Sequence, residues 1–203
     1  MKPLKNETYL CILEAARKEF SAKGFKNASM RTIAKTGGVS LSNIYNYFES
    51  KDQIFREILT PLITHMYRVM DENHTQKETS FEWVMTDEYQ EEMTDIFLNM
   101  TEKYRTEFLM LLYQSQGSSL ENFMEQFVDR TRKSVEQYFH LMQENYPGGN
   151  FRISDFFISL SASMRLTVLG EMIRRDLSRK QIREFLREYM LFSTSGWKGL
   201  IGI

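Results

Sequence analysis

Small polar side chains gather in residues 40–51, and their spacing suggests hydrogen bonding to duplex DNA. If this segment forms a helix with Ile44 facing inward, Ser42, Asn43 and Asn46 share its outer face. That face carries no charge, whereas a helix that is merely solvated more often shows lysine and glutamate. Serine and asparagine can hydrogen-bond to base edges, and asparagine pairs well with N6 and N7 of adenine. The pattern therefore predicts base readout, and the alternative is an exposed helix without a partner.

Phosphate contacts could come from the edges of the same segment. Ser40, Tyr45, Tyr47 and Lys51 offer hydroxyl and ammonium groups of the kind that hold a DNA backbone. The charge distribution agrees, because residues 1–52 hold nine Lys and Arg against five Asp and Glu, while the remainder holds 17 against 22. A basic first part favours a polyanionic partner. Taken alone, the charge difference could be a chance fluctuation, and the tyrosines could simply be solvated.

Three helices must position these side chains. Apolar residues recur at helical spacing from Asn6 to Phe20, and Gly24 then ends the first helix. Ser29 can cap a second, short helix over residues 30–36, and Ser40 can cap a third that runs to about residue 47. Two short helices braced by a longer one predict a helix-turn-helix unit.

The turn between the second and third helices has residues of the size that it needs. Gly37 and Gly38 break the second helix, and Gly38 is expected to adopt a positive φ. Ala34 is small where the two helices cross, and Ile44 anchors the third helix from inside. These steric roles support the helix-turn-helix prediction.

Residues 29–51, SMRTIAKTGGVSLSNIYNYFESK, resemble the DNA-binding segment of the TetR family of transcriptional regulators. The specific pattern is Gly-Val-Ser, three residues, Ile-Tyr, one residue, Tyr-Phe, two residues, Lys, and the resemblance extends over about residues 6–60. The DNA-binding residues that the resemblance implies are Ser29, Arg31, Ser40, Leu41, Ser42, Asn43, Tyr45, Asn46, Tyr47 and Lys51.

By position, the resemblance places Arg31 near the major groove, and it gives the phosphates to Ser40, Tyr47 and Lys51. Two residues depart from expectation. Gly37 stands where the family more often has alanine, and Leu41 is partly inward by helical rotation although the resemblance sets it against the bases. An apolar contact of Leu41 with a thymine methyl would satisfy both.

The whole chain is expected to be all-α. It has 3 Pro and 10 Gly in 203 residues, and good helix formers are frequent. We expect a helix-turn-helix DNA-binding domain of three helices in residues 1–52 and a larger helical effector-binding and dimerisation domain in residues 53–203. The long helices expected after residue 80 span 81–101, 103–116, 118–145, 153–176 and 178–194. Ser118 with Glu121, and Ser178 with Gln181, predict capping boxes at two of the starts.

A fourth helix should begin at a capping box formed by Ser50 and Gln53. Pro61 removes one backbone hydrogen bond inside it, so we expect a kink near Thr60 or two consecutive helices. The polar residues 71–80 predict the helix end and a loop.

Methionine and aromatic side chains are frequent in the second part, where they could line an adaptable cavity or simply form the core. Proteins of the resembling family usually bind a small effector here. The candidate pocket residues are Met93, Phe97, Met100, Tyr104, Phe108, Tyr113, Phe123 and Phe127. The last two long helices resemble the pair that forms a four-helix dimer interface, with the candidates Phe157, Leu160, Met164, Val168, Phe185 and Tyr189.

Two groups of charges recur at helical spacing. An acidic group could be a solvated face or a site for a cationic effector or metal, and it comprises Glu88, Glu91, Glu92 and Asp95. A second group predicts an exposed stripe of ion pairs, and it comprises Arg179, Arg183 and Arg187 with Glu184 and Glu188.

Other classes of function find no support in the sequence. It lacks a Gly-x-Ser-x-Gly elbow, a phosphate-binding glycine loop and a His-Glu-x-x-His motif, so we expect neither an enzyme nor a cofactor. The lone Cys11 and the scattered histidines argue against a zinc site, and Cys11 is expected to be buried. Apolar runs are too short to suggest a membrane span, and the first ten residues do not resemble a signal peptide, so we expect a cytoplasmic protein.

The sequence thus predicts a dimeric transcriptional regulator, in the first instance a repressor that a small-molecule effector releases from a palindromic DNA operator. One alternative is an effector-independent protein that organises DNA or binds a partner with the same head. Another is a helical carrier or enzyme whose head no longer binds DNA.

Overall fold

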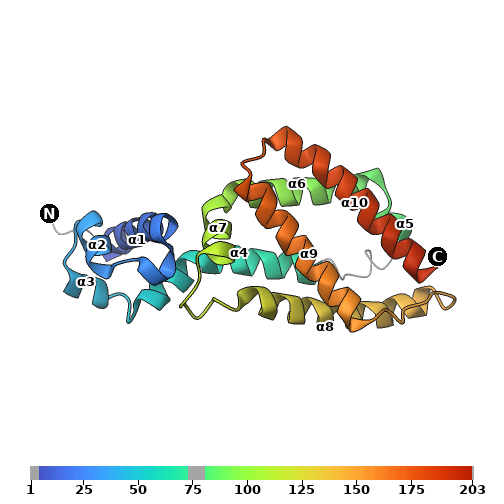
Figure 1. Ribbon diagram of the computed structural model, residues 1–203, viewed down its shortest axis with the longest axis horizontal. Coiled ribbons are helices and arrows are strands. Elements are labelled where there is room, and N and C mark those ends of the chain that lie inside the picture. Colours follow the sequence, from blue (N-terminus) through green and yellow to red (C-terminus); the bar gives the residue numbers. More distant parts are fainter. Residues whose placement is uncertain (1–4, 73–80, 203) are drawn as a thin grey trace. The chain divides into compact units, whose positions relative to one another are not determined.

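The computed structural model describes residues 5–72 and 81–202, and within these residues every regular element is an α-helix (Figure 1). The all-α prediction is confirmed. The helices are α1 Lys5–Asn27, α2 Met30–Thr36, α3 Leu41–Tyr45, α4 Lys51–Glu72, α5 Phe81–Val84, α6 Asp87–Lys103, α7 Arg105–Tyr113, α8 Phe123–Asn145, α9 Asp155–Arg174 and α10 Arg179–Ile201.

The chain divides into two compact units. The first comprises residues up to His65 together with Thr106–Phe123, and the second comprises Met66–Arg105 and Met124–Ile203. The first unit is larger than the domain expected in residues 1–52, because α7 and the first half of α4 complete its core. The backbone N–H of Phe25 donates to the carbonyl of Gln114 at 2.8 Å, which ties the end of α1 to the chain after α7.

Apolar side chains from four helices form the core of the first unit. Ile12 and Phe20 of α1, Ile33 of α2, Ile44 of α3 and Phe55 of α4 have no exposed surface. The rings of Phe20 and Phe55 meet edge to face with their centroids 5.0 Å apart. Burying each such side chain stabilises the fold by roughly 1.5–3 kcal/mol. The shared core therefore holds α3 in a fixed orientation against α1, α2 and α4.

Serine caps begin the short helices as the sequence indicated. The Ser29 hydroxyl accepts a hydrogen bond from the N–H of Thr32 at the start of α2, and the Ser40 hydroxyl accepts one from Asn43 at the start of α3. Each cap satisfies a backbone donor that the first helical turn leaves without a partner. The third helix ends at Tyr45, two residues earlier than expected, and Asn46 is its C-cap.

Two glycines have the left-handed backbone that ends a helix. Gly24 has a φ of 71°, so the regular helix breaks there as predicted, although α1 continues to Asn27 after the break. Gly38 has a φ of 64° in the turn between α2 and α3. A side chain at either position would strain the backbone, since L-residues rarely adopt this region.

The start of α4 and its proline differ in detail from expectation. The Ser50 hydroxyl accepts from the N–H of Gln53, but the Gln53 side chain accepts from the N–H of Glu49 instead of Ser50. The helix is continuous through Pro61, so two consecutive helices are not formed. The predicted loop lies mostly in residues 73–80, outside the described residues.

The second unit contains α5, α6, α8, α9, α10 and the end of α4. Its helices α6 and α10 lie side by side (Figure 1). Ile158 of α9, Met142 and Phe139 of α8 and Ile201 of α10 form a buried cluster. The predicted capping box at Ser178 is present, with the Gln181 side chain accepting from the Ser178 N–H.

One expected helix is broken in two, and another begins later than expected. A break after α5 separates it from α6, which begins where the Thr86 hydroxyl accepts from the N–H of Tyr89. The expected capping box of Ser118 is absent, because this buried hydroxyl donates to the Ser115 carbonyl and α8 begins only at Phe123. A serine followed by an acid three residues later therefore marked a turn here.

Cys11 and α9 also differ from what the sequence led us to expect. Cys11 is exposed on α1, not buried, since Ile12 and Ala15 fill the inner face beside it. By length and composition α9 could cross a membrane, although no such segment was expected. Core helices of soluble proteins pass the same test, and one side of α9 is buried within the second unit.

Candidate nucleic-acid interface and effector cavity

The exposed side of α3 carries the side chains that the sequence selected for base contacts. Ile44 is fully buried, whereas Ser42, Tyr45 and Asn46 are exposed, and we call these three residues the α3 face. Asn43 is half-buried, and its side-chain oxygen lies 3.5 Å from the side-chain nitrogen of Asn46. The face thus presents amide and hydroxyl groups that can donate and accept, and it carries no charge.

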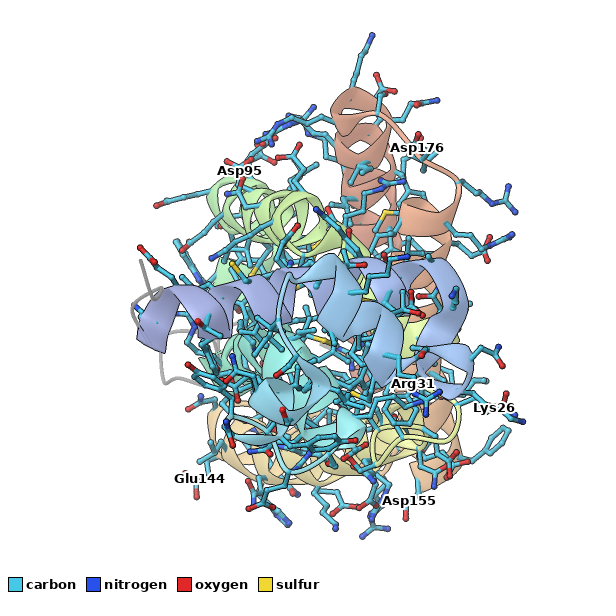
Figure 2. All side chains as sticks on the ribbon, turned by 90° about the vertical axis from the view of Figure 1, so that its left-hand side faces the viewer. Lys26, Arg31, Asp95, Glu144, Asp155 and Asp176 are labelled. Carbon is cyan, nitrogen blue, oxygen red and sulfur yellow. The ribbon has the colours of Figure 1, made fainter. Side chains whose placement is uncertain are left out.

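The other predicted base-contacting residues differ in their exposure. Arg31 is exposed on α2, and Figure 2 shows its side chain and that of Lys26 extending outward. Leu41 is half-buried, which leaves room for one apolar contact. Ser29 is half-buried and is engaged on two sides, since its hydroxyl caps α2 and its backbone N–H donates to Glu19 at 3.0 Å. In the structure, Ser29 therefore serves as the N-cap of α2.

Ser40 and Tyr47 lie at the two ends of α3. The Ser40 hydroxyl is exposed and lies 3.0 Å from that of Ser42, while it also caps the helix. Tyr47 is half-buried, with its ring centroid 6.4 Å from that of Tyr9. Tyr9 in turn stacks on Phe48 and donates to Glu57, so it fixes the end of α3 against α1 and α4.

Lys51 is not free to serve as a phosphate anchor in this structure. Its ammonium donates to the carbonyls of Phe25 at 2.7 Å, Ala28 at 3.1 Å and Lys26 at 3.4 Å. It also lies 4.5 Å from the centre of the Phe25 ring. Burial lowers its pKa from the ordinary value. The ammonium therefore satisfies the carbonyls at the end of α1, a role that the sequence analysis did not foresee.

A cavity of about 300 Å³ lies within the second unit. Helices α4, α5, α6, α8, α9 and α10 all contribute to its wall. Four predicted pocket residues line it, namely Met93, Phe97, Met100 and Phe127. Most of the lining is apolar, as in sites that bind small organic molecules.

The other four predicted pocket residues do not line this cavity. Phe108 and Phe123 are buried in the first unit, and Tyr113 is half exposed there. Tyr104 is the C-cap of α6 and lies at its end, beyond the part of the helix that borders the cavity. Helical spacing identifies apolar faces, but it does not show which unit an apolar face joins.

Arg165 of α9 is a lining residue that the sequence analysis missed. It is the only charged residue in 156–170, an otherwise apolar and small-residue segment, and this was the signal that could have found it. Burial lowers the pKa of Arg165, while the nearby Tyr89 and Tyr189 raise it. Both tyrosines line the same cavity.

The candidate dimer residues occupy two different environments. Phe157, Leu160 and Met164 of α9 are exposed, at 39, 54 and 41% of their surface. Val168 and Tyr189 instead line the cavity. Phe185 is half-buried and stacks on Tyr189, with their ring centroids 5.9 Å apart. Exposed apolar residues that the sequence analysis did not select include Phe156, Leu191 and Phe192.

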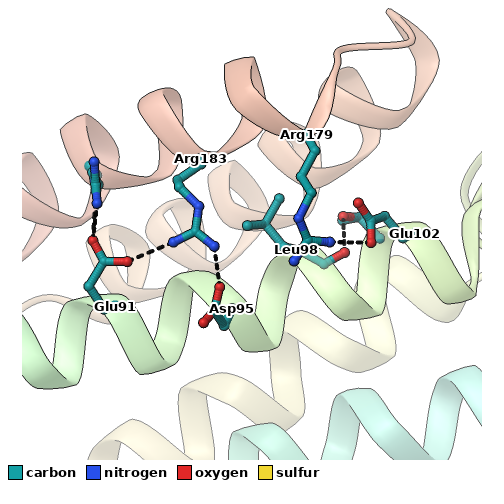
Figure 3. A network of polar contacts seen from close by, with 8 residues as sticks. Glu91, Asp95, Leu98, Glu102, Arg179 and Arg183 are labelled. Carbon is teal, nitrogen blue, oxygen red and sulfur yellow. Dashed lines mark hydrogen bonds and ion pairs between the residues drawn. The ribbon is translucent and has the colours of Figure 1, made fainter.

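Two members of the acidic group form ion pairs with the arginine stripe, and these side chains remain partly exposed. Arg183 of α10 donates to Glu91 at 2.7 Å and to Asp95 at 2.5 Å, both on α6 (Figure 3). Arg187 also donates to Glu91, and Arg179 donates to Glu102. Arginine thus relieves the repulsion between neighbouring acids, and within the described residues no group of three or more potential metal ligands is present.

Comparison with known proteins agrees with this geometry. Residues 12–58 match the family model described as bacterial regulatory proteins, tetR family. YfiR of Bacillus subtilis, an uncharacterized HTH-type transcriptional regulator, is 24% identical over 168 residues, which is 79% of each chain.

Solved structures share the whole fold. A transcriptional regulator of the TerR/AcrR family from Aquifex aeolicus has a TM-score of 0.62 at 18% identity, covering 91% of this chain and 98% of its own. NalD of Pseudomonas aeruginosa, the secondary repressor of the MexAB-OprM multidrug efflux pump, has a TM-score of 0.57 at 18% identity, with 93% and 96% covered. These similar proteins are regulators and not enzymes. Residues 12–58 accordingly form a segment of the tetR family, and the chain as a whole is similar to HTH-type transcriptional regulators.

Proposed function

We propose that the protein is a cytoplasmic homodimeric repressor that binds a palindromic DNA operator and is released by a small-molecule effector. The observation that carries the proposal is the α3 face, in which Ser42, Tyr45 and Asn46 are exposed above a fully buried Ile44. An uncharged, hydrogen-bonding face on a short helix fits the major groove, where each base pair presents a distinct pattern of donors and acceptors.

Arg31 and the half-buried Leu41 extend the proposed interface beyond the α3 face. In this proposal, Arg31 supplies a charged donor beside the major groove. The hydroxyls of Ser40 and Tyr47 contact DNA phosphates. Lys51 is left out of the direct contacts because its ammonium is held by backbone carbonyls. Ser29 acts indirectly, by fixing the start of α2.

A second copy of the chain is the proposed occupant of the exposed apolar side of α9 and α10. Phe156, Leu160 and Phe192 are 77, 54 and 67% exposed, and apolar side chains gathered on adjacent helices commonly mark an interface. In sequence, these two helices also resemble the pair that forms a four-helix dimer interface in the TetR family. Two α3 helices related by two-fold symmetry would enter successive major grooves about 34–36 Å apart, which requires a palindromic operator.

The cavity is the proposed effector site. Met66, Val69 and Met70 line it from the C-terminal part of α4, and the N-terminal part of the same helix supplies Ile54 and Phe55 to the core of the first unit. An effector that binds better to the conformation with weak DNA affinity would shift the population toward it. NalD, which has the same fold, is described as a repressor, and this supports repression over activation.

A mobility-shift titration with the DNA upstream of the protein's own gene tests the proposal. One palindromic segment should be bound tightly, and Asn46→Ala should relax base preference at one position in each half-site by roughly 1–3 kcal/mol. Asn27→Ala is the matched control, because it removes the same amide from an exposed site at the end of α1. Weak binding to all sequences alike would favour a DNA-organising protein, and no binding would favour a carrier.

A further inference from the structure

The wall of the cavity contains one arginine among mostly apolar side chains. Arg165 precedes Leu166 on α9, and both line the cavity together with Met93, Phe97 and Trp197. The guanidinium remains charged at any physiological pH. Its side chain is accessible, and it forms part of the cavity wall, so a molecule that fills the cavity would meet it.

The charge of Arg165 is not balanced by the protein in the described part of the chain. Within residues 5–72 and 81–202, Arg165 forms no ion pair with a carboxylate, and the groups that act on its charge are the phenols of Tyr89 and Tyr189. Burial lowers its pKa from the ordinary value. The guanidinium therefore has no acidic partner among the described residues, although it borders the cavity. By contrast, Arg183, Arg187 and Arg179 elsewhere in the second unit all have acidic partners.

We infer that the ligand of the cavity is a small organic anion with one carboxylate, held by Arg165, and an apolar body that fills the remaining space. This rests on the proposal that the cavity is the effector site. A carboxylate can form two parallel hydrogen bonds with a guanidinium, and the Tyr189 hydroxyl, which also lines the cavity, can add a further donor. A volume of about 300 Å³ lies at the lower end of the usual range for ligand sites, which favours a small molecule.

A cationic ligand is disfavoured by the same geometry. Within the second unit, the acids Glu91 and Asp95 are already bonded to arginines, and neither lines the cavity. A cation in the cavity would lie near Arg165 without a carboxylate to balance it. A neutral ligand would leave the guanidinium without a partner.

The test is calorimetric titration of the full-length protein with probes that differ only in the head group. Decanoate, 1-decanol and decylamine share an aliphatic tail, and 1-naphthoate represents aromatic carboxylates. Decanoate or 1-naphthoate should bind at least about tenfold more tightly than the alcohol and the amine. The stronger of the two carboxylates identifies whether the source is an aliphatic or an aromatic acid.

Two variants assign the preference to Arg165. Arg165→Gln should weaken carboxylate binding at least about tenfold and leave 1-decanol unchanged. Arg175→Gln is the matched control, since it removes the same charge just after α9 from a residue outside the cavity. A thermal melt checks folding, and Arg165→Gln should not lower the melting temperature, because the exposed Arg165 forms no ion pair within the described residues.

Two results would overturn the inference. Equal affinity for decanoate and 1-decanol in both wild type and Arg165→Gln would refute selection by charge, while leaving the cavity as an effector site. Failure of both carboxylates to bind would also refute it. Operator binding by the same samples, measured by mobility shift, decides the DNA-binding function independently of either result.

Discussion

The ammonium nitrogen of Lys51 lies 2.7 Å from the carbonyl oxygen of Phe25, across a separation of 26 residues in the chain. Two more carbonyls, those of Ala28 and Lys26, accept from the same group. The first residue of α4 therefore closes the end of α1, and it also supports the loop that leads to the Ser29 cap. The sequence motif for DNA binding thus includes a lysine whose ammonium stabilises the folded unit by bonding backbone carbonyls.

Replacing Lys51 should accordingly reduce stability more than it changes the salt dependence of DNA binding. Lys51→Met retains much of the apolar stem but removes the donors, and we expect the free energy of unfolding to fall by about 1.5–3 kcal/mol. Urea denaturation measures this. Lys26→Met, which changes an exposed lysine of the last turn of α1, is the matched control and should have little effect.

The DNA-binding assay separates the two roles of Lys51. If Lys51 held a phosphate, its loss would flatten the plot of log binding constant against log salt by about 0.9. We expect that change for Arg31→Met and not for Lys51→Met. A flattened slope for Lys51→Met without loss of stability would restore the phosphate role.

The sequence was informative where structure depends on neighbouring residues. Ser29 and Ser40 caps, the φ of Gly38 and the inward Ile44 all follow from local spacing, and this is why the helix-turn-helix outline was predictable. The partners of Lys51 were not predictable, since they are backbone carbonyls and carry no side-chain signature.

Long-range pairing accounts for the remaining differences. The acids of α6 and the arginines of α10 were recognised separately, but their contact depends on how two distant helices pack. The same limit applies to the cavity, because Phe108 and Phe97 have similar local patterns and belong to different units. Arg165 was overlooked because one charge in an apolar helix has meaning only once the cavity is known.

Charge on the exposed side of α9 should prevent dimerisation. Leu160 is 54% exposed, and burial of its side chain against a second copy would be lost in Leu160→Glu, which would also place an unpaired charge in the interface. We expect sedimentation to show a monomer. Leu10→Glu is the matched control, because Leu10 is a similarly exposed leucine, at 56%, on α1 of the first unit. Dimers of Leu160→Glu at wild-type strength would place the interface elsewhere.

The contact between α6 and α10 should contribute a modest, salt-dependent coupling energy. A double-mutant cycle of Asp95→Asn and Arg183→Met should give about 0.5–1 kcal/mol, because the two side chains are partly exposed. Urea denaturation is suitable, since it leaves the ionic strength unchanged, and the coupling should decrease in 1 M salt. The pair Lys180 and Glu184, 3.8 Å apart and more exposed, should give a smaller coupling. Equal values for both pairs would contradict this interpretation.

Alkaline pH should weaken the first unit through Tyr9. Burial and the hydrogen bond to Glu57 raise the pKa of Tyr9 to about 12 from 10.0. Because the folded pKa is the higher one, the folded state favours the protonated phenol, so this contribution is complete below pH 10 and is lost as the pH rises through 12. The free energy of unfolding of the wild type should therefore fall more steeply across this window than that of Tyr9→Phe, which has no phenol to titrate there. Urea denaturation followed by circular dichroism at several pH values measures the difference. Tyr45→Phe, which removes an exposed hydroxyl from the α3 face, is the control and should show the wild-type dependence of the free energy of unfolding on pH. If Tyr9→Phe also showed the wild-type dependence, the Tyr9 hydrogen bond would not contribute to stability.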